Sequence, residues 1–142
     1  MMKTKITALG DSLTKGVVLT ENNRYSVTEH SYMDIISNEL GLYVENYGKF
    51  GCTVDTGSTV LERHKEAIAA SDYTFLEFGG NDCDFDWMKV AGDPESRHIP
   101  NNSLKSFMEK FPALIDKVRE LGSTPVIMSL PPIISDTYFS FF

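Results

Sequence analysis

The alternation of short apolar runs with helical patterns constrains the fold of this chain more than any other feature. The runs are rich in β-branched or aromatic residues and are bounded by turn residues, which is typical of buried strands. They cover residues 6–9, 43–47, 73–78 and 125–130. Because parallel strands are joined by crossover helices, the alternation predicts an α/β fold: a parallel sheet with helices on both faces, in three α/β/α layers.

Apolar residues recur at helical spacing in three segments between these runs. The longest stripe extends from Leu104 to Leu121, with Ser103 as a plausible N-cap and Gly122 as the stop. Pro112 lies within it and predicts a kink or a restart of the helix. The two shorter stripes consist of Tyr32, Ile35, Ile36 and Leu40, and of Val60, Leu61, His64, Ala67 and Ile68.

Length and charge restrict the classes of protein to consider. With 142 residues and 42% hydrophobic composition, residues 1–142 fit a single domain. The net charge of −7 argues against nucleic acid or an anionic membrane as a partner, because either requires a basic surface. We find no signal peptide and no apolar stretch of the roughly 20 residues that a membrane span needs, so we expect a cytoplasmic protein. Cys52 and Cys83 are too few for a disulfide scaffold and are expected to be free thiols.

Three loops follow the first three strand-like runs and hold residues suited to acyl transfer. They are residues 10–12, 48–51 and 79–82. In parallel α/β sheets, ligands bind beyond the carboxyl ends of the strands, so these loops should lie together. A serine, a glycine-rich turn with free backbone N–H groups and a side-chain amide provide an oxygen nucleophile and donors for the oxyanion.

These loops resemble the sequence blocks of the SGNH hydrolases, also called the GDSL-type lipase/esterase family. The matching segments are Gly10-Asp11-Ser12-Leu13, the stretch from Asn46-Tyr47-Gly48 to Gly51, and Gly79-Gly80-Asn81-Asp82. The resemblance extends to Pro131-Pro132 and implies a flavodoxin-like sheet and a serine esterase for small acyl or acetyl esters, with no metal or organic cofactor. It implies that Ser12 is the nucleophile of an acyl-enzyme mechanism. The implied oxyanion donors are the backbone N–H groups of Ser12 and Gly51 and the side-chain amide of Asn81.

The fourth block of the family, an Asp-x-x-His run that carries the catalytic base, is missing from this sequence. His30 lies in a polar loop, and His64 lies on an apolar helical stripe, where a structural role is expected. His98 follows Glu95 by three residues, but nothing in the sequence directs it to Ser12. We therefore expect a fifth strand, the base and a last helix to lie beyond Phe142, and this chain alone to be inactive or weakly active.

The last strand-like run supports the same expectation. Residues 125–130 would present an unpaired apolar edge to water, which natural sheets avoid. The tail at 138–142 has four aromatic residues in five positions. We expect a second copy of the chain or a complementary C-terminal fragment to cover both.

Other readings of the same loops are weaker or remain open. Residues 82–86 alternate carboxylates like a calcium loop, but the required glycine is replaced by Trp87, so a solvated acidic loop is expected. Lys15-Gly16 is in the wrong order for a phosphate loop, and the Gly-x-Ser-x-Gly elbow is incomplete. Two alternatives remain: a flavodoxin-like phosphate or flavin site, and a non-catalytic acyl- or glycan-binding relative. The loops 20–31 and 84–102 should shape any pocket, and Asp11 is expected to be structural.

Overall fold

The computed structural model describes residues 4–134 and 136 and contains the parallel sheet that the sequence predicts. Its strands are β1 (Lys5–Gly10), β4 (Tyr43–Asn46), β5 (Tyr73–Glu77) and β6 (Thr124–Ile127). They pair in the order β4-β1-β5-β6 and all are parallel. This arrangement corresponds to the first four strands of the flavodoxin-like order and confirms the predicted fold class. The predicted run at 125–130 is too long, because β6 ends at Ile127.

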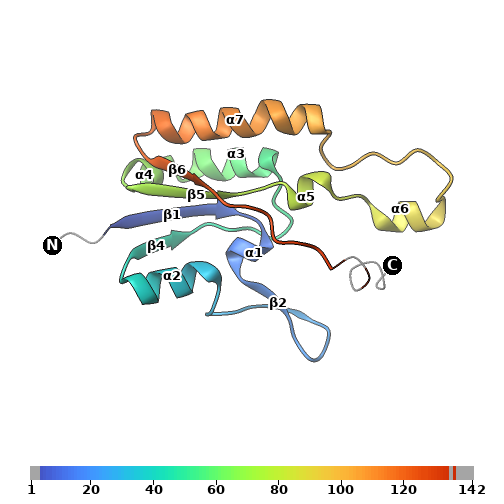
Figure 1. The fold of residues 1–142 in the computed structure, drawn as a ribbon, viewed down its shortest axis with the longest axis horizontal. Helices are drawn as coiled ribbons and strands as arrows, with labels where there is room; N and C mark the ends of the chain where they lie inside the picture. Colours follow the sequence, from blue (N-terminus) through green and yellow to red (C-terminus); the bar gives the residue numbers. More distant parts are fainter. Residues whose placement is uncertain (1–3, 135, 137–142) are drawn as a thin grey trace.

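Helices cover both faces of the sheet (Figure 1). Helix α2 (Tyr32–Leu40) packs on one face, where Ile6, Ala8 and Met33 form a small core. Helices α3 (Val54–Arg63), α4 (Lys65–Ala69) and α7 (Leu104–Glu120) lie on the other face. The larger core there joins both chain halves, from Leu9 and Leu76 on the sheet to Val118 on α7. The molecule therefore has three layers.

Helix α7 is continuous through Pro112, so the restart predicted at that residue is wrong. Pro112 is on the exposed side of the helix, and Leu114 and Val118 hold the following turns against the core. The predicted cap is confirmed, because Ser103 Oγ accepts the Ser106 N–H at 3.1 Å.

The predicted helical stripe from Val60 to Ile68 is divided between two helices. Helix α3 ends at Arg63 and α4 begins at Lys65, and His64 lies between them. The His64 ring stacks on Tyr47, with centroids 3.7 Å apart. This contact agrees with the structural role expected for His64.

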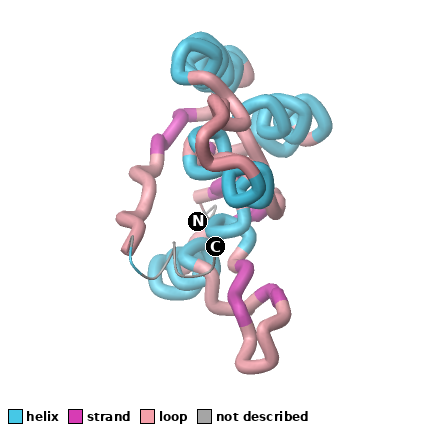
Figure 2. The backbone as a smooth tube through the Cα atoms, turned by 90° about the vertical axis from the view of Figure 1, so that its right-hand side faces the viewer, coloured by secondary structure: helices cyan, strands magenta, loops and turns pink. Residues whose placement is uncertain are grey.

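Several short elements have no counterpart in the sequence prediction. Strands β2 (Val17–Leu19) and β3 (Tyr25–Val27) form an antiparallel hairpin that projects from the body (Figure 2). Helices α1 (Ser12–Lys15), α5 (Gly80–Cys83) and α6 (Trp87–Gly92) lie in or near the loops after β1 and β5. All of them are too short to produce a periodic hydrophobic pattern.

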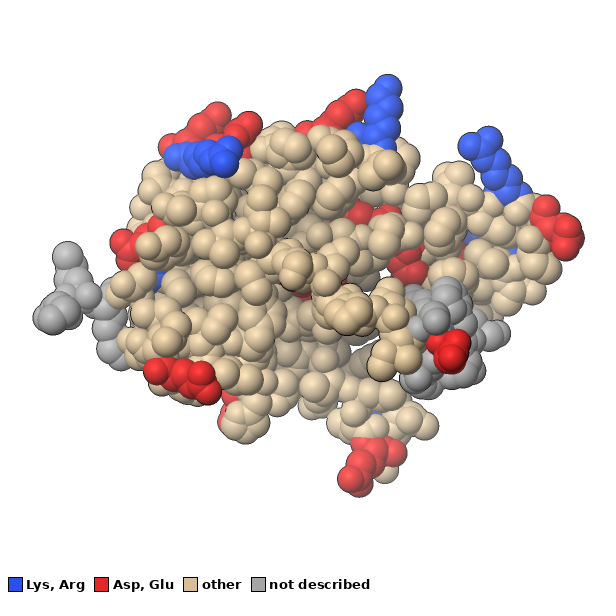
Figure 3. All heavy atoms as spheres, in the orientation of Figure 1, with Lys and Arg blue, Asp and Glu red and all other residues tan. Residues whose placement is uncertain are grey.

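Strand β6 is at the edge of the sheet formed by the described residues. Ile127 is 57% exposed, and Leu130, Ile133 and Ile134 continue an exposed apolar strip after the strand. Figure 3 shows a broad uncharged surface on this side of the molecule, with charged side chains mainly at its margins. The aromatic segment 138–142 is outside the described residues. Among the helices of residues 4–134 and 136, none has the length and apolar character of a membrane span.

Gly48 is where the second loop packs against α1. A Cβ atom there would lie 2.4 Å from the Lys15 backbone nitrogen and 2.9 Å from the Lys15 Cα. Neither backbone atom can rotate away, so we expect Gly48→Ala to lower the free energy of unfolding by about 2 kcal/mol or more. Urea denaturation measures this change.

Gly92→Ala is the matched control for Gly48→Ala. An added Cβ at Gly92 meets no atom within 4 Å. We expect it to change the free energy of unfolding by less than about 0.5 kcal/mol. Equal effects of the two substitutions would contradict the close packing of α1 on the second loop.

Candidate active site

The carboxyl edge of the sheet brings the three loops together, as the sequence predicts. Lys49 N–H in the second loop donates to the Gly10 carbonyl at 3.0 Å. The Asn81 side-chain amide in the third loop donates to Asp11 Oδ2 at 3.0 Å and to the Cys52 carbonyl at 3.2 Å. Asn81 thus connects all three loops.

Ser12 is the first residue of the short helix α1, directly after β1. Asp11 caps this helix, because its Oδ1 accepts the Leu13 N–H at 2.8 Å. Ser12 is half-buried, whereas Asp11 is only 5% exposed. The expected structural role of Asp11 is therefore supported by two contacts, one to Leu13 and one to Asn81.

The second loop is shaped by Asn46 at the end of β4. Its side-chain amide donates to the Thr14 carbonyl at 2.6 Å, and its Oδ1 accepts the Gly48 N–H at 2.9 Å. Gly51 follows with a φ of +68°, in the left-handed region that favours glycine, and is exposed. Its backbone N–H therefore belongs to a turn held against α1 through Asn46.

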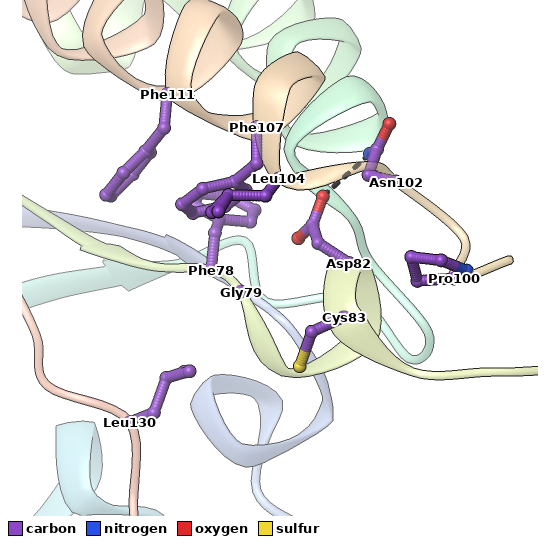
Figure 4. Close-up of a pocket in the computed structure, with 10 residues that line it drawn as sticks. All are labelled: Phe78, Gly79, Asp82, Cys83, Pro100, Asn102, Leu104, Phe107, Phe111 and Leu130. Carbon is purple, nitrogen blue, oxygen red and sulfur yellow. Dashed lines mark hydrogen bonds between the residues drawn. The ribbon is translucent and has the colours of Figure 1, made fainter.

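The third loop begins at Gly79, whose φ of +126° turns the chain from β5 into α5. Asp82 in α5 is 2% exposed, and its carboxylate accepts the Val54 N–H at 3.0 Å and 3.2 Å. The Asn102 side chain donates to Asp82 Oδ1 at 2.8 Å (Figure 4). Asp82 therefore anchors α5 to α3 and to the segment before α7.

The expectation that 82–86 is a solvated acidic loop is wrong for Asp82 and incomplete for its neighbours. Asp84 Oδ1 accepts from the Trp87 indole N–H at 2.6 Å, and Asp86 caps α6. The carboxylates are thus used for internal hydrogen bonds. Across residues 4–134 and 136, the structure contains no group of three or more His, Cys, Asp or Glu residues able to hold a metal ion.

A third buried carboxyl group, that of Glu77, lies beneath the nucleophile turn. Glu77 is 3% exposed, and its Oε2 accepts from the Thr14 hydroxyl at 3.0 Å. Burial, followed by the neighbouring Asp11 carboxylate, raises the pKa of Glu77 to about 7. Gly10 makes room for this arrangement, because a Cβ there would lie 2.2 Å from Thr14 Oγ1. Glu77 was not predicted from the sequence. The one sequence feature that marks it is a charged residue at the end of a buried strand.

All three histidines lie within the described residues, and their positions differ from that of a base next to Ser12. His30 is exposed in the loop before α2, and His64 stacks on Tyr47. His98 Nε2 is 2.7 Å from the Asp93 carbonyl and 3.2 Å from Ser96 Oγ, within its own loop. The resemblance of Glu95 and His98 to a carboxylate–histidine pair is therefore not matched by a contact with the nucleophile turn.

A cavity of about 400 Å³ borders α5 on the side facing α7. In Figure 4 the rings of Phe78, Phe107 and Phe111 gather beneath α7, and Leu130 lies across the cavity from them. The remaining lining residues are Gly79, Asp82, Cys83, Pro100, Asn102 and Leu104. The short helix that carries Asn81 therefore contributes Asp82 and Cys83 to the cavity wall.

The sheet has the flavodoxin-like strand order of an α/β domain, with these three loops at its carboxyl edge. The model of the GDSL-like lipase/acylhydrolase family matches residues 8–140. The chain belongs to this family. A search of curated proteins found no match.

Solved structures with similar folds include a lipase/acylhydrolase from Enterococcus faecalis, with 20% identity and a TM-score of 0.70. The match covers 95% of this chain and 61% of that protein. AlinE4, an SGNH-hydrolase family esterase, matches with 20% identity and a TM-score of 0.62, over 93% of this chain and 62% of AlinE4. The psychrotrophic esterase EstA from Pseudoalteromonas sp. matches with 16% identity and a TM-score of 0.59, over 99% of this chain and 68% of EstA. The chain therefore spans roughly three fifths of the length of the first two.

Proposed function

We propose that this chain carries the nucleophile and oxyanion half of a serine esterase that hydrolyses small acyl or acetyl esters. The observation that carries the proposal is that the loops bearing Ser12, Gly51 and Asn81 adjoin one another. Lys49 bonds to Gly10, and Asn81 bonds to Asp11 and Cys52. Family membership supports hydrolysis of an ester bond. The same chemistry also acts on other acyl substrates. The preference for small acyl or acetyl groups is therefore itself part of the proposal.

In the proposed reaction, a general base removes the proton from Ser12 Oγ, which attacks the ester carbonyl carbon. The negative charge on the carbonyl oxygen is stabilised by the backbone N–H groups of Ser12 and Gly51 and by the Asn81 amide. Protonation of the leaving alcohol yields an acyl-enzyme. Water, activated by the same base, then releases the acid and restores Ser12.

The Asn81 amide is oriented before substrate arrives. Asp11 Oδ2 and the Cys52 carbonyl both accept from its Nδ2, so the oxyanion must share or replace one of these acceptors. The Asp11 carboxylate carries charge and the Cys52 carbonyl does not, so the longer bond to Cys52 is the one we expect to yield. Asn81 can then retain its bond to Asp11 while it donates to the oxyanion.

We propose that the general base is supplied from outside residues 1–142. His30, His64 and His98 are engaged or exposed elsewhere, as described above. The exposed strip of Ile127, Leu130, Ile133 and Ile134 beside β6 is suited to receive the polypeptide that brings the base, either a C-terminal fragment or a second copy. A small-molecule ester then binds against a site completed by both parts.

Covalent labelling with a fluorophosphonate tests this proposal. We expect slow labelling of Ser12 in the 142-residue chain, faster labelling when free imidazole is added as a base, and faster labelling still in a version extended through the natural reading frame. Intact-mass and peptide mass spectrometry measure the rate and the position of the adduct. Strong labelling of the 142-residue chain that imidazole and extension leave unchanged would contradict an external base. No labelling in any of the three would favour the acyl- or glycan-binding alternative.

A further inference from the structure

Two carboxyl groups from different strands meet beneath the nucleophile turn. Asp11 follows β1 and Glu77 ends β5, and Gly10 and Glu77 are register partners in the sheet. Asp11 is 5% exposed and Glu77 is 3% exposed. Two buried carboxylates in contact cannot both be ionised without a large electrostatic cost. We refer to them as the Asp11–Glu77 pair.

The hydrogen bonds around the pair have a consistent direction. The Tyr32 hydroxyl lies 2.8 Å from Thr14 Oγ1, and Thr14 Oγ1 donates to Glu77 Oε2 at 3.0 Å. Burial raises the pKa of Tyr32 to about 12, so its phenol stays protonated and can donate to Thr14. On the other side of the pair, Asn81 Nδ2 donates to Asp11 Oδ2. Donors therefore approach both carboxyl groups from outside the pair.

One oxygen of the pair lacks a partner among the described residues. Glu77 Oε1 is buried and accepts no hydrogen bond from residues 4–134 or 136. A buried oxygen of this kind is costly as part of a carboxylate. As a protonated O–H group it becomes a donor. Asp11, whose backbone N–H donates to Glu77 Oε2 at 3.4 Å, offers its carboxylate as a neighbouring acceptor.

We propose that the Asp11–Glu77 pair shares one proton, held on Glu77 Oε1 and donated to the Asp11 carboxylate, and that Glu77 is a positioning residue for Ser12 and Asn81. Glu77 acts on Ser12 through Asp11 and Thr14 on either side of it, and on the Asn81 amide through Asp11. It touches neither substrate nor the reacting atoms. The catalytic part of this inference rests on the proposed function, whereas the shared proton does not.

The other titratable groups around the pair do not remove the repulsion. Tyr32 on α2 is neutral, and burial raises the pKa of Cys52 in the second loop to about 11, so it is neutral too. Asp82 on α5 adds negative charge near Cys52, and Lys49 adds a positive charge there. A second negative charge on Glu77 would therefore act mainly on Asp11.

The pH dependence follows from the raised pKa of Glu77. The unfolded chain loses this proton near the ordinary value of 4.5, and the folded chain keeps it until about 7. The contribution to stability is therefore fully present below 4.5 and is lost as pH rises through about 7. Above that pH, repulsion within the pair should also loosen the Asp11 contacts with Leu13 and Asn81.

Glu77→Gln is the decisive variant, because its amide N–H₂ can donate to Asp11 as the protonated acid does, while its carbonyl accepts from Thr14. In carbon-13 NMR, we expect the Glu77 carboxyl to titrate near neutral pH in the wild-type protein. We expect the urea midpoint to fall between pH 4.5 and about 7 in the wild type and to fall less in Glu77→Gln. Glu77→Ala should lower the midpoint at every pH, because it removes the side chain and leaves a buried gap.

Glu62→Gln on the exposed side of α3 is the matched control and should keep the wild-type slope. A Glu77 carboxyl that titrates like an exposed glutamate, or an identical slope in Glu77→Gln and wild type, overturns the shared proton. The functional arm compares the pH profile of Ser12 labelling. We expect labelling to decline above about pH 7 in the wild type, where the Asp11 contacts loosen, and not to decline in Glu77→Gln. An unchanged decline would overturn the positioning role. If Ser12 is labelled in none of the proteins, the proposed function fails. The NMR and urea measurements still test whether the Asp11–Glu77 pair shares a proton.

Discussion

Ser12→Ala is expected to abolish covalent labelling of the protein by a fluorophosphonate in the presence of imidazole. Removal of a serine nucleophile eliminates the bond-forming oxygen, and we expect a loss of about 10³-fold or more. The fold should be retained, because Ser12 is half-buried and the helix cap is made by Asp11. Intact-mass spectrometry against time measures the rate, and peptide mapping identifies the labelled residue.

Ser58→Ala is the matched control for this substitution. Ser58 is an exposed serine on α3 whose hydroxyl bonds the Val54 carbonyl within the same helix. We expect labelling of Ser58→Ala at the wild-type rate. An adduct that persists in Ser12→Ala at the same rate would assign the nucleophile to another residue and remove the basis of the proposed mechanism.

Asn81→Ala is expected to slow the imidazole-assisted labelling of Ser12 by about 10²-fold to 10³-fold, which is the range for loss of one oxyanion donor. The substitution removes the side-chain N–H groups and also the contact between the three loops. A urea melt of the same variant separates these effects, because a loss of stability alone leaves the labelling rate of the folded fraction unchanged.

Asn38→Ala, an exposed asparagine on α2, should behave as the wild type in both measurements. A wild-type labelling rate in Asn81→Ala would show that the amide serves only to join the loops. In that case Ser12 and Gly51 alone would supply the oxyanion donors. The two outcomes therefore distinguish a chemical role for Asn81 from a purely structural one.

The sequence was sufficient for the sheet because each strand is a compact apolar run bounded by turns. It was also sufficient to predict that the loops of Ser12, Gly51 and Asn81 adjoin, because parallel strands place their carboxyl ends on one edge. The β2–β3 hairpin escaped prediction for a physical reason. Each strand has three residues, and both strands are largely exposed, so no hydrophobic alternation marks them.

The buried carboxyl groups could not be assigned from the sequence. Asp11 meets Asn81, Glu77 meets Thr14 and Asp82 meets Val54, at sequence separations of 70, 63 and 28. Neither charge nor spacing indicates which acidic residues turn inward, since acidic side chains are normally exposed. Asp82 shows the result, because its alternation with Asp84 and Asp86 looks like a solvated loop but its carboxylate anchors α5.

The position of each strand in the sheet has a consequence for how different parts of the site open. Strands β1 and β5 each have a neighbour on both sides, whereas β6 is held by β5 alone among the described residues. Local unfolding starts where few contacts are lost, so amide hydrogens in β6 should exchange with solvent before those in β1. Fraying of β6 would displace Leu130 from the cavity wall and leave the turn at Ser12 in place. The cavity wall and the nucleophile are therefore expected to belong to different cooperative units. Local unfolding of the cavity wall can then leave the turn that positions Ser12 intact.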